Sequence, residues 1–328
     1  MKTRPVGRTD LQITEIGFGC APLGNLYRPV SEDAVDEVLE AAWEAGIRYF
    51  DTAPHYGGGL AEERLGRFLR TKKRDDYVIS TKVGRILDTV AREEAEDHGF
   101  VDAHPVRLEY DYTGDGIMRS LEASHKRMGT DRFEILFVHD IGEYTHGRER
   151  NEKHMRDFRE SGIRKLNDLR DAGVIKAWGL GVNEVEVLLD VMRDTHLDVI
   201  LMAGRYTLLD RSAEKELLPL CRRRGTSFVI GGVFNSGIMA TGPVPGATFN
   251  YSTASDEVKE RVRRMQEIAE AEGTDLATAA LQFPFREQAV ASVLLGTTKA
   301  SSLRRNMDAL KTPLDPSIFG KFDEHAIR

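Results

Sequence analysis

Residues 49–59 read YFDTAPHYGGG, and the rest of the chain can be interpreted outward from this stretch. It begins as the end of a short buried strand and then delivers Asp51 and Tyr56 into a glycine-rich loop. In α/β proteins, the loops at strand ends hold the chemistry. Two later strand ends supply Lys82 and His139. These four residue types at successive strand ends form a set that can move a proton at a carbonyl group.

Strand-like and helix-like runs alternate along the chain. The strand-like runs are short and apolar without alternation, as is typical of parallel strands that are covered on both faces. From residue 16 there are eight of them, at 16–20, 47–50, 77–83, 133–138, 177–182, 199–203, 226–233 and 290–295. Helix-like runs follow at 31–45, 61–69, 114–128, 163–172, 184–193, 212–224, 256–272, 276–283 and 301–310. This pattern predicts an α/β fold, a (β/α)8 TIM barrel, as one domain over residues 1–328, with a small β-hairpin in front of it within residues 2–16.

Two segments interrupt the alternation, residues 85–113 and residues 141–162. Both are long and charged, and they follow the third and the fourth strand. We expect them to form long rim loops at the catalytic end of the barrel and to select the substrate, because long loops within compact domains tend to be functional or disordered. Their conformation does not follow from the residue pattern.

Composition limits the class of protein. Charged residues make up 30% and hydrophobic residues 41% of the chain, which fits a soluble globular protein. The net charge of −7 argues against nucleic acid as a partner, because nucleic-acid-binding domains carry a basic excess. The N-terminal residues do not resemble a signal peptide, and no apolar run is long enough to cross a bilayer. We therefore expect a cytoplasmic protein with a small-molecule substrate and no membrane partner, and the oligomeric state stays open.

The cysteines and histidines of the sequence give little support for a disulfide framework or a metal site. The two cysteines, Cys20 and Cys221, are too few and too far apart for a disulfide framework or a cysteine-rich metal site. The nine histidines are scattered, and none stands at a convincing ligand spacing from another ligand type. We expect no metal.

The four strand-end residues have a chemical logic as a group. A tyrosine in water loses its proton near pH ~10, and a nearby ammonium group favours the phenolate. Lys82 would supply the ammonium group to Tyr56, and Asp51 would hold Lys82 in place. His139 would orient the carbonyl oxygen. Each residue alone also has an ordinary structural explanation, as a helix cap, a solvated charge, a core histidine or a tyrosine packed over glycines, but their joint occurrence favours catalysis.

A phosphate-binding candidate lies near the end of the chain. No Gly-x-Gly-x-x-Gly follows a strand and opens a helix, so a Rossmann site is absent. Residues 295–299, LGTTK, leave the eighth strand and enter a helix. Glycine, hydroxyl groups and free helix N–H groups can bind an anion there, although an ordinary capped helix explains the same residues equally well.

With these motifs in this order, the chain resembles the aldo-keto reductases over nearly its whole length. Residues 7–19 are similar to the opening hairpin and first strand of that family. Asp51, Tyr56, Lys82 and His139 match its catalytic tetrad, and Gly296 with Asn306 resembles its cofactor-binding end. A closer resemblance is to the group that contains D-threo-aldose 1-dehydrogenase, L-fucose dehydrogenase and pyridoxal 4-dehydrogenase. That resemblance rests on residues 53–57, 110–116, 203–209 and 234–238.

The resemblance implies an NAD or NADP cofactor stretched across the barrel mouth without a Rossmann fold. It also implies direct hydride transfer, with Tyr56 as general acid and base, that would convert an aldose to a lactone at C1. An aldehyde or pyridoxal reductase or dehydrogenase of the same family is the first alternative. The second is a non-catalytic cofactor-binding regulatory subunit, since barrels of this family also serve as redox-sensing partners of membrane channels.

The resemblance also carries over individual contacts. For the cofactor these are Gly19, Asp51, Asn183, Phe234, Ser236, Gly237, Gly296, Thr297, Thr298, Lys299, Ser302, Arg305 and Asn306. For the substrate we expect contacts from His55, Tyr56, Tyr112, His139 and Arg205.

Several positions depart from the family pattern. Much of the family has Gly-Val-Ser-Asn after the fifth strand, but residues 179–183 read GLGVN, so the serine is missing and Asn183 is shifted by one position. Ala203 stands where a glutamine is frequent. The aromatic residue that stacks on nicotinamide is replaced within residues 231–234.

One further departure concerns the choice between NAD and NADP. Strongly NADP-selective members have an arginine four residues before the final asparagine, where this chain has Ser302. Without that guanidinium group on the 2′-phosphate, NAD should at least be tolerated. Lys299, Arg304 and Arg305 keep NADP open.

Overall fold

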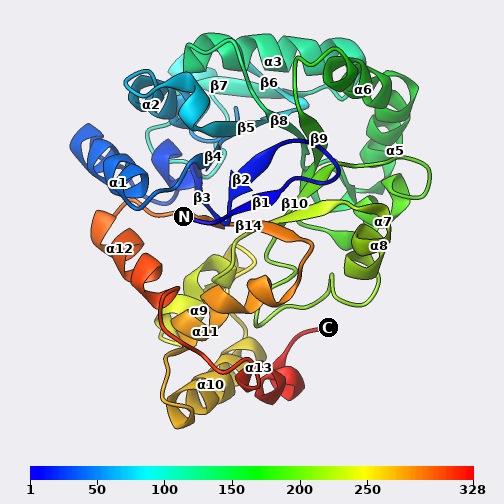
Figure 1. Cartoon of the computed structure of the whole chain (residues 1–328). Coiled ribbons are helices and arrows are strands. Elements are labelled where there is room, and N and C mark those ends of the chain that lie inside the picture. The colour runs from blue at the N-terminus through cyan, green and yellow to red at the C-terminus, as the bar shows by residue number, and fades with distance from the viewer.

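Eight parallel strands close into a barrel in the computed structural model, which describes residues 1–328. Around the barrel the order is β10-β11-β14-β3-β4-β5-β8-β9. The strands are β3 (Ile16–Gly19), β4 (Tyr49–Asp51), β5 (Val78–Val83), β8 (Ile135–His139), β9 (Ala177–Val182), β10 (Val199–Ala203), β11 (Ser227–Gly231) and β14 (Val290–Leu295). Helices surround the barrel on the outside (Figure 1). The predicted (β/α)8 barrel is confirmed, and the prediction of a single domain over the whole chain stays a prediction.

Helices connect the strands close to their expected positions. They are α1 (Glu32–Glu44), α2 (Leu60–Leu69), α3 (Gly114–Met128), α6 (Ile163–Asp171), α7 (Val185–Val191), α8 (Leu217–Arg224), α9 (Ile238–Thr241), α10 (Asp256–Ala271), α11 (Leu276–Gln282), α12 (Ala300–Ala309) and α13 (Ile318–Lys321). Short 3-10 turns lie at Ala21–Gly24, Arg74–Asp76, Arg92–Glu94, Asn235–Gly237, Phe283–Arg286 and Asp323–His325. Ser31 caps α1 by accepting a hydrogen bond from the Ala34 amide, as its residue type predicts. Helix α8 begins five residues later than the expected residue 212.

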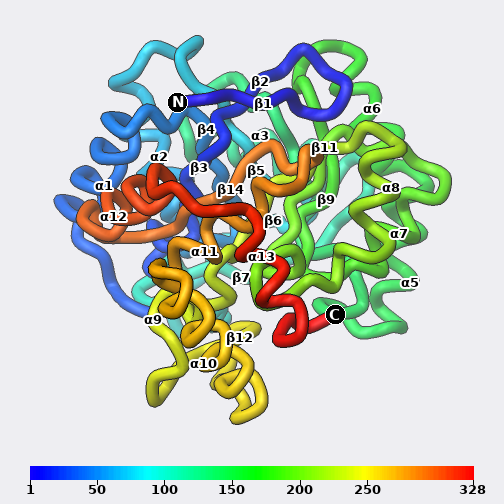
Figure 2. The backbone as a smooth tube through the Cα atoms, turned by 60° about the horizontal axis from the view of Figure 1, so that its bottom comes forward, coloured from blue at the N-terminus to red at the C-terminus, as the bar shows by residue number.

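The predicted N-terminal hairpin closes one end of the barrel. It consists of β1 (Thr3–Pro5) and β2 (Gln12–Thr14), which pair antiparallel. Val6 and Ile13 from the hairpin pack into the cluster of side chains that fills the barrel interior. The Gly7 amide donates to Ser227 Oγ at 2.8 Å, which ties the hairpin to the start of β11. Figures 1 and 2 show the hairpin across this end, away from the β12 (Thr248–Phe249) and β13 (Ser252–Thr253) hairpin, whose β12 is labelled near the bottom of Figure 2.

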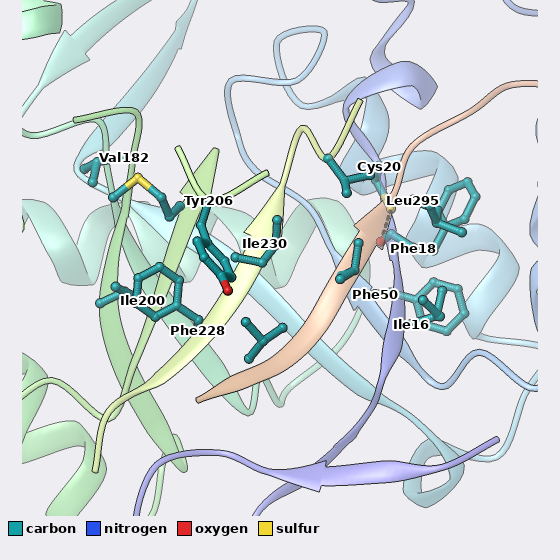
Figure 3. Close-up of a cluster of buried hydrophobic side chains, with 14 of the residues drawn as sticks. Ile16, Phe18, Cys20, Phe50, Val182, Ile200, Tyr206, Phe228, Ile230 and Leu295 are labelled. Carbon is teal, nitrogen blue, oxygen red and sulfur yellow. Dashed lines mark hydrogen bonds between the residues drawn. The ribbon is translucent and has the colours of Figure 1, made fainter. Parts of the chain in front are cut away.

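Two hydrophobic clusters form the core. The larger lies between the barrel strands and the surrounding helices, and Figure 3 shows Ile16, Phe18, Phe50 and Leu295 projecting into it. The smaller fills the barrel and includes Tyr49. Successive strand residues point to opposite faces, so most strands supply both clusters, whereas Ile16 and Phe18 of β3 pack only into the larger one. This filled interior leaves only the C-terminal ends of the strands open for chemistry.

The two rim segments are structured, which differs from the expectation of long loops. Residues 85–113 contain an antiparallel pair, β6 (Arg85–Thr89) with β7 (Val106–Tyr110). Residues 141–162 are mostly helical, with α4 (Glu143–His146), α5 (Arg148–Asp157) and a π-helical turn, Phe158–Gly162, that continues into α6. The alternation of Val106, Leu108 and Tyr110 was a strand signal. Helix α5 carries little apolar periodicity and is instead supported by surface pairs such as Lys153 with Asp157, at 3.0 Å.

We expect Gly17→Ala to lower the free energy of unfolding by about 1–3 kcal/mol. Gly17 points into the barrel, where a Cβ atom would lie 2.7 Å from both the Leu294 and the Tyr49 side chains. Urea unfolding followed by circular dichroism measures the change. Gly320→Ala is the matched control, because nothing lies within 4 Å of a Cβ atom at that helical position. Equal stability of the two variants would contradict the tight interior packing.

Candidate active site

The strand register brings three of the four predicted catalytic residues to one end of the barrel. Asp51 is the last residue of β4 and pairs in register with Gly19 of β3 and Ser80 of β5. Lys82 lies two residues farther along β5, and His139 is the last residue of β8. Because parallel strands present their C-terminal ends at the same edge, these side chains converge.

A buried ion pair forms the base of the site. Lys82 Nζ lies 2.7 Å from Asp51 Oδ2 and donates to the Thr52 carbonyl at 2.9 Å. Both side chains of the pair are buried. Ser80 Oγ donates to the other oxygen of Asp51 at 2.7 Å, so the Tyr49 hydroxyl must in turn donate to Ser80, at 2.9 Å. This chain fixes the carboxylate, and the carboxylate fixes the ammonium group.

Ser80 was not predicted as part of the site. The signal for it was its position two residues before Lys82, because residues i and i+2 of a strand share a face. Tyr49 stands in the same relation to Asp51.

Tyr56 lies directly beside this pair, as predicted. Lys82 Nζ is 4.9 Å from the centre of the Tyr56 ring. Burial raises the pKa of Tyr56 to about 12, and the Lys82 ammonium, which lowers it, offsets burial only in part. The expectation that Lys82 makes this phenol more acidic than in water is therefore corrected, because the desolvation of the phenolate is the larger effect. At neutral pH the Tyr56 phenol therefore carries its proton.

Two histidines lie next to the Tyr56 ring and next to each other. The ring centres of His139 and His55 lie 6.0 and 6.5 Å from that of Tyr56. Burial lowers the pKa of His55 to about 2, and burial together with Arg85 and Lys82 lowers the pKa of His139 well below its usual value. Both imidazoles are neutral, and Nδ1 of each is buried without a hydrogen-bond partner. Their predicted contacts with the substrate stay predictions.

A rim residue covers this group. Phe100, from the segment between β6 and β7, lies 5.3 Å from His55 and 6.1 Å from Tyr56, measured between ring centres. The Val101 amide next to it donates to the Asn25 carbonyl at 3.0 Å. The segment thus shields the side chains of His55 and Tyr56 from solvent.

Two predicted substrate contacts are corrected. Tyr112 is fully buried, and its hydroxyl donates to the His139 carbonyl at 2.8 Å and accepts from His146 Nε2 at 2.9 Å. Arg205 donates to Asn250 at 2.8 Å and pairs with Asp210 at 3.3 Å, and it does not line the cavity. A residue pattern places a side chain near a strand end but does not tell which way it points.

A cavity of about 590 Å³ extends from Asp51 and Tyr56 toward the start of α12. All the predicted cofactor contacts except Lys299 line it, namely Gly19, Asp51, Asn183, Phe234, Ser236, Gly237, Gly296, Thr297, Thr298, Ser302, Arg305 and Asn306. Lys299 is exposed and lies outside the wall, so its predicted contact is not supported. Tyr27, Arg28 and Tyr251 also line the cavity. They were missed because they lie in loops whose course no periodicity predicts.

The wall of this cavity suits an elongated, phosphate-bearing molecule. Glycine at position 296 lets the backbone there lie close to that of Gly19, because a Cβ atom at residue 296 would be 3.2 Å from the Gly19 carbonyl oxygen. Arg28 and Arg305 supply guanidinium groups, and Arg28 donates to Thr298 at 2.7 Å. The only carboxylate in the wall is Asp51, which Lys82 neutralises. Hydroxyl groups and guanidinium groups along a glycine-lined wall are the donors that a dinucleotide needs.

Two other features bear on function. No group of three or more His, Cys, Asp or Glu side chains is arranged to hold a metal ion. None of the helices combines the length and the apolar character that a membrane crossing would need.

Comparison with known proteins agrees with the motifs. The model of the Aldo/keto reductase family matches residues 15–327. The chain is 44% identical over 314 residues to pyridoxal 4-dehydrogenase from Microbacterium luteolum, covering 93% of this chain and 91% of that protein. It is 40% identical over 311 residues to D-threo-aldose 1-dehydrogenase from a Pseudomonas species, covering 92% of each. The resemblance to this family and to the group around these two enzymes is confirmed.

Solved structures show the same fold. An aldo-keto reductase from Bacillus halodurans in its holo form superposes with a TM-score of 0.77 at 24% identity. The superposition covers 99% of this chain and 96% of that one. At this identity the likeness supports the barrel and not a particular substrate.

Proposed function

This chain belongs to the aldo/keto reductase family, and from that premise we propose that it oxidises the C1 hydroxyl of an aldose to give a lactone. The protein is an oxidoreductase, and its cofactor is NAD or NADP. One observation carries the proposed chemistry. The Tyr56 side chain lies in the wall of the cavity of about 590 Å³ and at the same time beside the Lys82–Asp51 pair.

The proposed reaction assigns a role to each of the four residues. Tyr56, as phenolate, would accept the proton of the C1 hydroxyl as the C=O bond forms, and a nicotinamide bound in the cavity would supply the acceptor for the hydride of the same carbon. Lys82 stabilises the phenolate by charge, and Asp51 holds Lys82. His139, which is neutral, donates an N–H to the substrate oxygen. In the reducing direction Tyr56 returns the proton.

We further propose that the cavity residues divide the cofactor between them. Asn183 follows β9 and lines the cavity, and its side chain would hold the nicotinamide amide. In this structure Asn183 Nδ2 donates instead to the Tyr251 hydroxyl at 3.4 Å. Thr297, Thr298 and Arg305 would bind phosphate oxygens at the other end.

Pyridoxal oxidation is the second candidate function. It is favoured by the 44% identity to a protein named pyridoxal 4-dehydrogenase. The neutral imidazoles of His55 and His139 can bind hydroxyl groups of either substrate, so the described site does not separate the two.

A direct assay separates these candidates. The purified protein is mixed with NAD or NADP and with L-fucose, D-arabinose or pyridoxal, and the absorbance of reduced nicotinamide is followed. We expect reduction of the cofactor with at least one aldose. Turnover of pyridoxal alone would favour the second candidate, and turnover of none of the three would remove both.

The raised pKa of Tyr56 predicts opposite pH profiles for the two directions. Oxidation needs the phenolate, whose fraction rises about tenfold per pH unit below the pKa, so kcat/KM for oxidation should climb through the alkaline range. Reduction needs the protonated phenol and should change little between about pH 6 and pH 9. Initial rates measured in both directions test this. A plateau of the oxidation rate near neutral pH would mean that Lys82 outweighs burial.

A further inference from the structure

Two charged side chains next to His139, Arg85 and Asp140, have no role in the reaction proposed above. Arg85 is the first residue of β6 and Asp140 follows β8 directly. The Arg85 guanidinium forms an ion pair with Asp140 Oδ2, and the Arg85 side chain is only 5% exposed. The same oxygen of Asp140 lies 3.4 Å from His139 Nε2.

The backbone at Asp140 places this carboxylate. Asp140 has a φ of +47°, the left-handed conformation that Asp tolerates better than most residues. Its amide donates to the Gly181 carbonyl at 2.9 Å, which holds the turn against β9. A left-handed residue other than glycine costs about 1–2 kcal/mol. This left-handed residue directly follows His139 in the sequence.

Arg85 favours the ionised form of Asp140. Burial raises the pKa of Asp140, and the Arg85 guanidinium acts against that effect. The guanidinium itself lies 5.3 Å from the centre of the Tyr110 ring, so β7 limits its movement. Without Arg85, this carboxyl group, which is 22% exposed, would more readily take up a proton.

The position of this carboxylate decides which nitrogen of His139 carries the proton. A neutral imidazole has one N–H and one bare nitrogen. Nδ1 of His139 is buried without a partner, so a proton there would be an unpaired buried donor at a cost of about 1–3 kcal/mol. A proton on Nε2 faces the Asp140 carboxylate instead. At 3.4 Å this contact is too long to be a good hydrogen bond, so the N–H stays free to donate to a substrate oxygen.

We propose that Asp140, held by Arg85, is a positioning residue that selects the Nε2–H tautomer of His139. The catalytic consequence rests on the proposed function, because the tautomer affects turnover only if His139 donates to the substrate oxygen. The competing explanation is purely structural, in which the ion pair only fastens the start of β6 to the end of β8. The two explanations predict different results when the carboxylate is replaced by an apolar side chain of similar size.

Nitrogen-15 NMR of protein labelled at histidine reads the tautomer directly, with the His139 signals assigned by their loss in His139→Asn. In the wild-type protein we expect a protonated Nε2 and a bare Nδ1. In Asp140→Leu neither Arg85 nor His139 Nε2 has an acceptor at this position, so we expect the Nε2–H tautomer to lose its preference and the Nδ1–H tautomer to become populated. Unchanged His139 signals in Asp140→Leu would overturn the proposal.

Kinetics and matched variants complete the test. Loss of the Nε2–H donor should lower kcat of Asp140→Leu by up to about 10²-fold, with little change in the Kd of the cofactor. Arg85→Lys should keep the Nε2–H signal, and Arg85→Gln should lose it. This pair of variants decides the matter if Asp140→Leu does not fold. Glu134→Gln removes a carboxylate that is paired with Arg74 at 2.7 Å at the opposite end of β8, and it should keep both the tautomer and kcat.

The two proposals fail in different ways. If the wild-type protein turns over neither aldoses nor pyridoxal, the proposed function fails, while the NMR signals still decide the tautomer. If Asp140→Leu loses kcat without a change of tautomer, or if Glu134→Gln loses kcat equally, the structural explanation holds and the positioning role is refuted.

Discussion

Replacing Tyr56 with Phe should lower kcat about 10²–10⁴-fold, which is the usual contribution of a general acid or base. The Tyr56 ring packs against His139 and lies next to Lys82, and a Phe ring preserves both contacts. Only the hydroxyl that exchanges the proton is lost. The Kd of NAD or NADP, measured by quenching of protein fluorescence, should therefore change little, while stopped-flow or steady-state rates collapse.

Tyr206→Phe is the control for this result. Tyr206 is also a buried tyrosine, but it packs with Phe228 and Phe283 in the cluster outside the barrel. Removal of the Tyr206 hydroxyl in this variant should leave kcat within about twofold of the wild-type value, as is usual for substitutions away from the reacting groups. Turnover of Tyr56→Phe at the wild-type rate would remove Tyr56 from the mechanism and leave only the fold and the cofactor cavity.

The barrel and the strand-end residues could be predicted because both follow from local pattern. Short apolar runs mark strands that are buried on both faces, and polar residues directly after such runs must lie at one rim. Asp51, Lys82 and His139 were found in this way, and the register of β4, β5 and β8 brings them to the same end of the barrel.

The pKa of Tyr56 and the roles of Tyr112 and Asp140 could not be predicted from the residue pattern, because they depend on packing between segments far apart in the sequence. The direction of the pKa shift at Tyr56 depends on how deeply the assembled rim buries it, with Phe100 lying 6.1 Å from its ring. Tyr112 lies just before a helix, and the sequence predicted it as a substrate contact at the rim. Its hydroxyl instead donates a hydrogen bond to the backbone carbonyl of His139. The role of Asp140 depends on a left-handed φ and on Arg85, which lies 55 residues earlier in the chain.

Lys82→Met should affect both stability and turnover more than any other single change in the site. Lys82 is almost fully buried, and its ammonium group is the partner of a carboxylate that is 3% exposed. Burial alone would lower the pKa of Lys82, but Asp51 and Tyr56 raise it above its usual value, so the lysine is charged at neutral pH. Removing the charge leaves Asp51 uncompensated, which should cost about 3–5 kcal/mol of unfolding free energy, measured by urea denaturation.

A second substitution separates the two effects of Lys82→Met. In the double variant Lys82→Met with Asp51→Asn, no uncompensated charge remains, because the amide replaces the carboxylate and can keep the hydrogen bond from Ser80 at Oδ1. Most of the lost unfolding free energy should return, since a neutral buried pair avoids the desolvation of a lone ion. Turnover should not return, because no ammonium group is left to stabilise the phenolate of Tyr56. Recovery of kcat together with stability would mean that Lys82 acts only as a structural partner of Asp51.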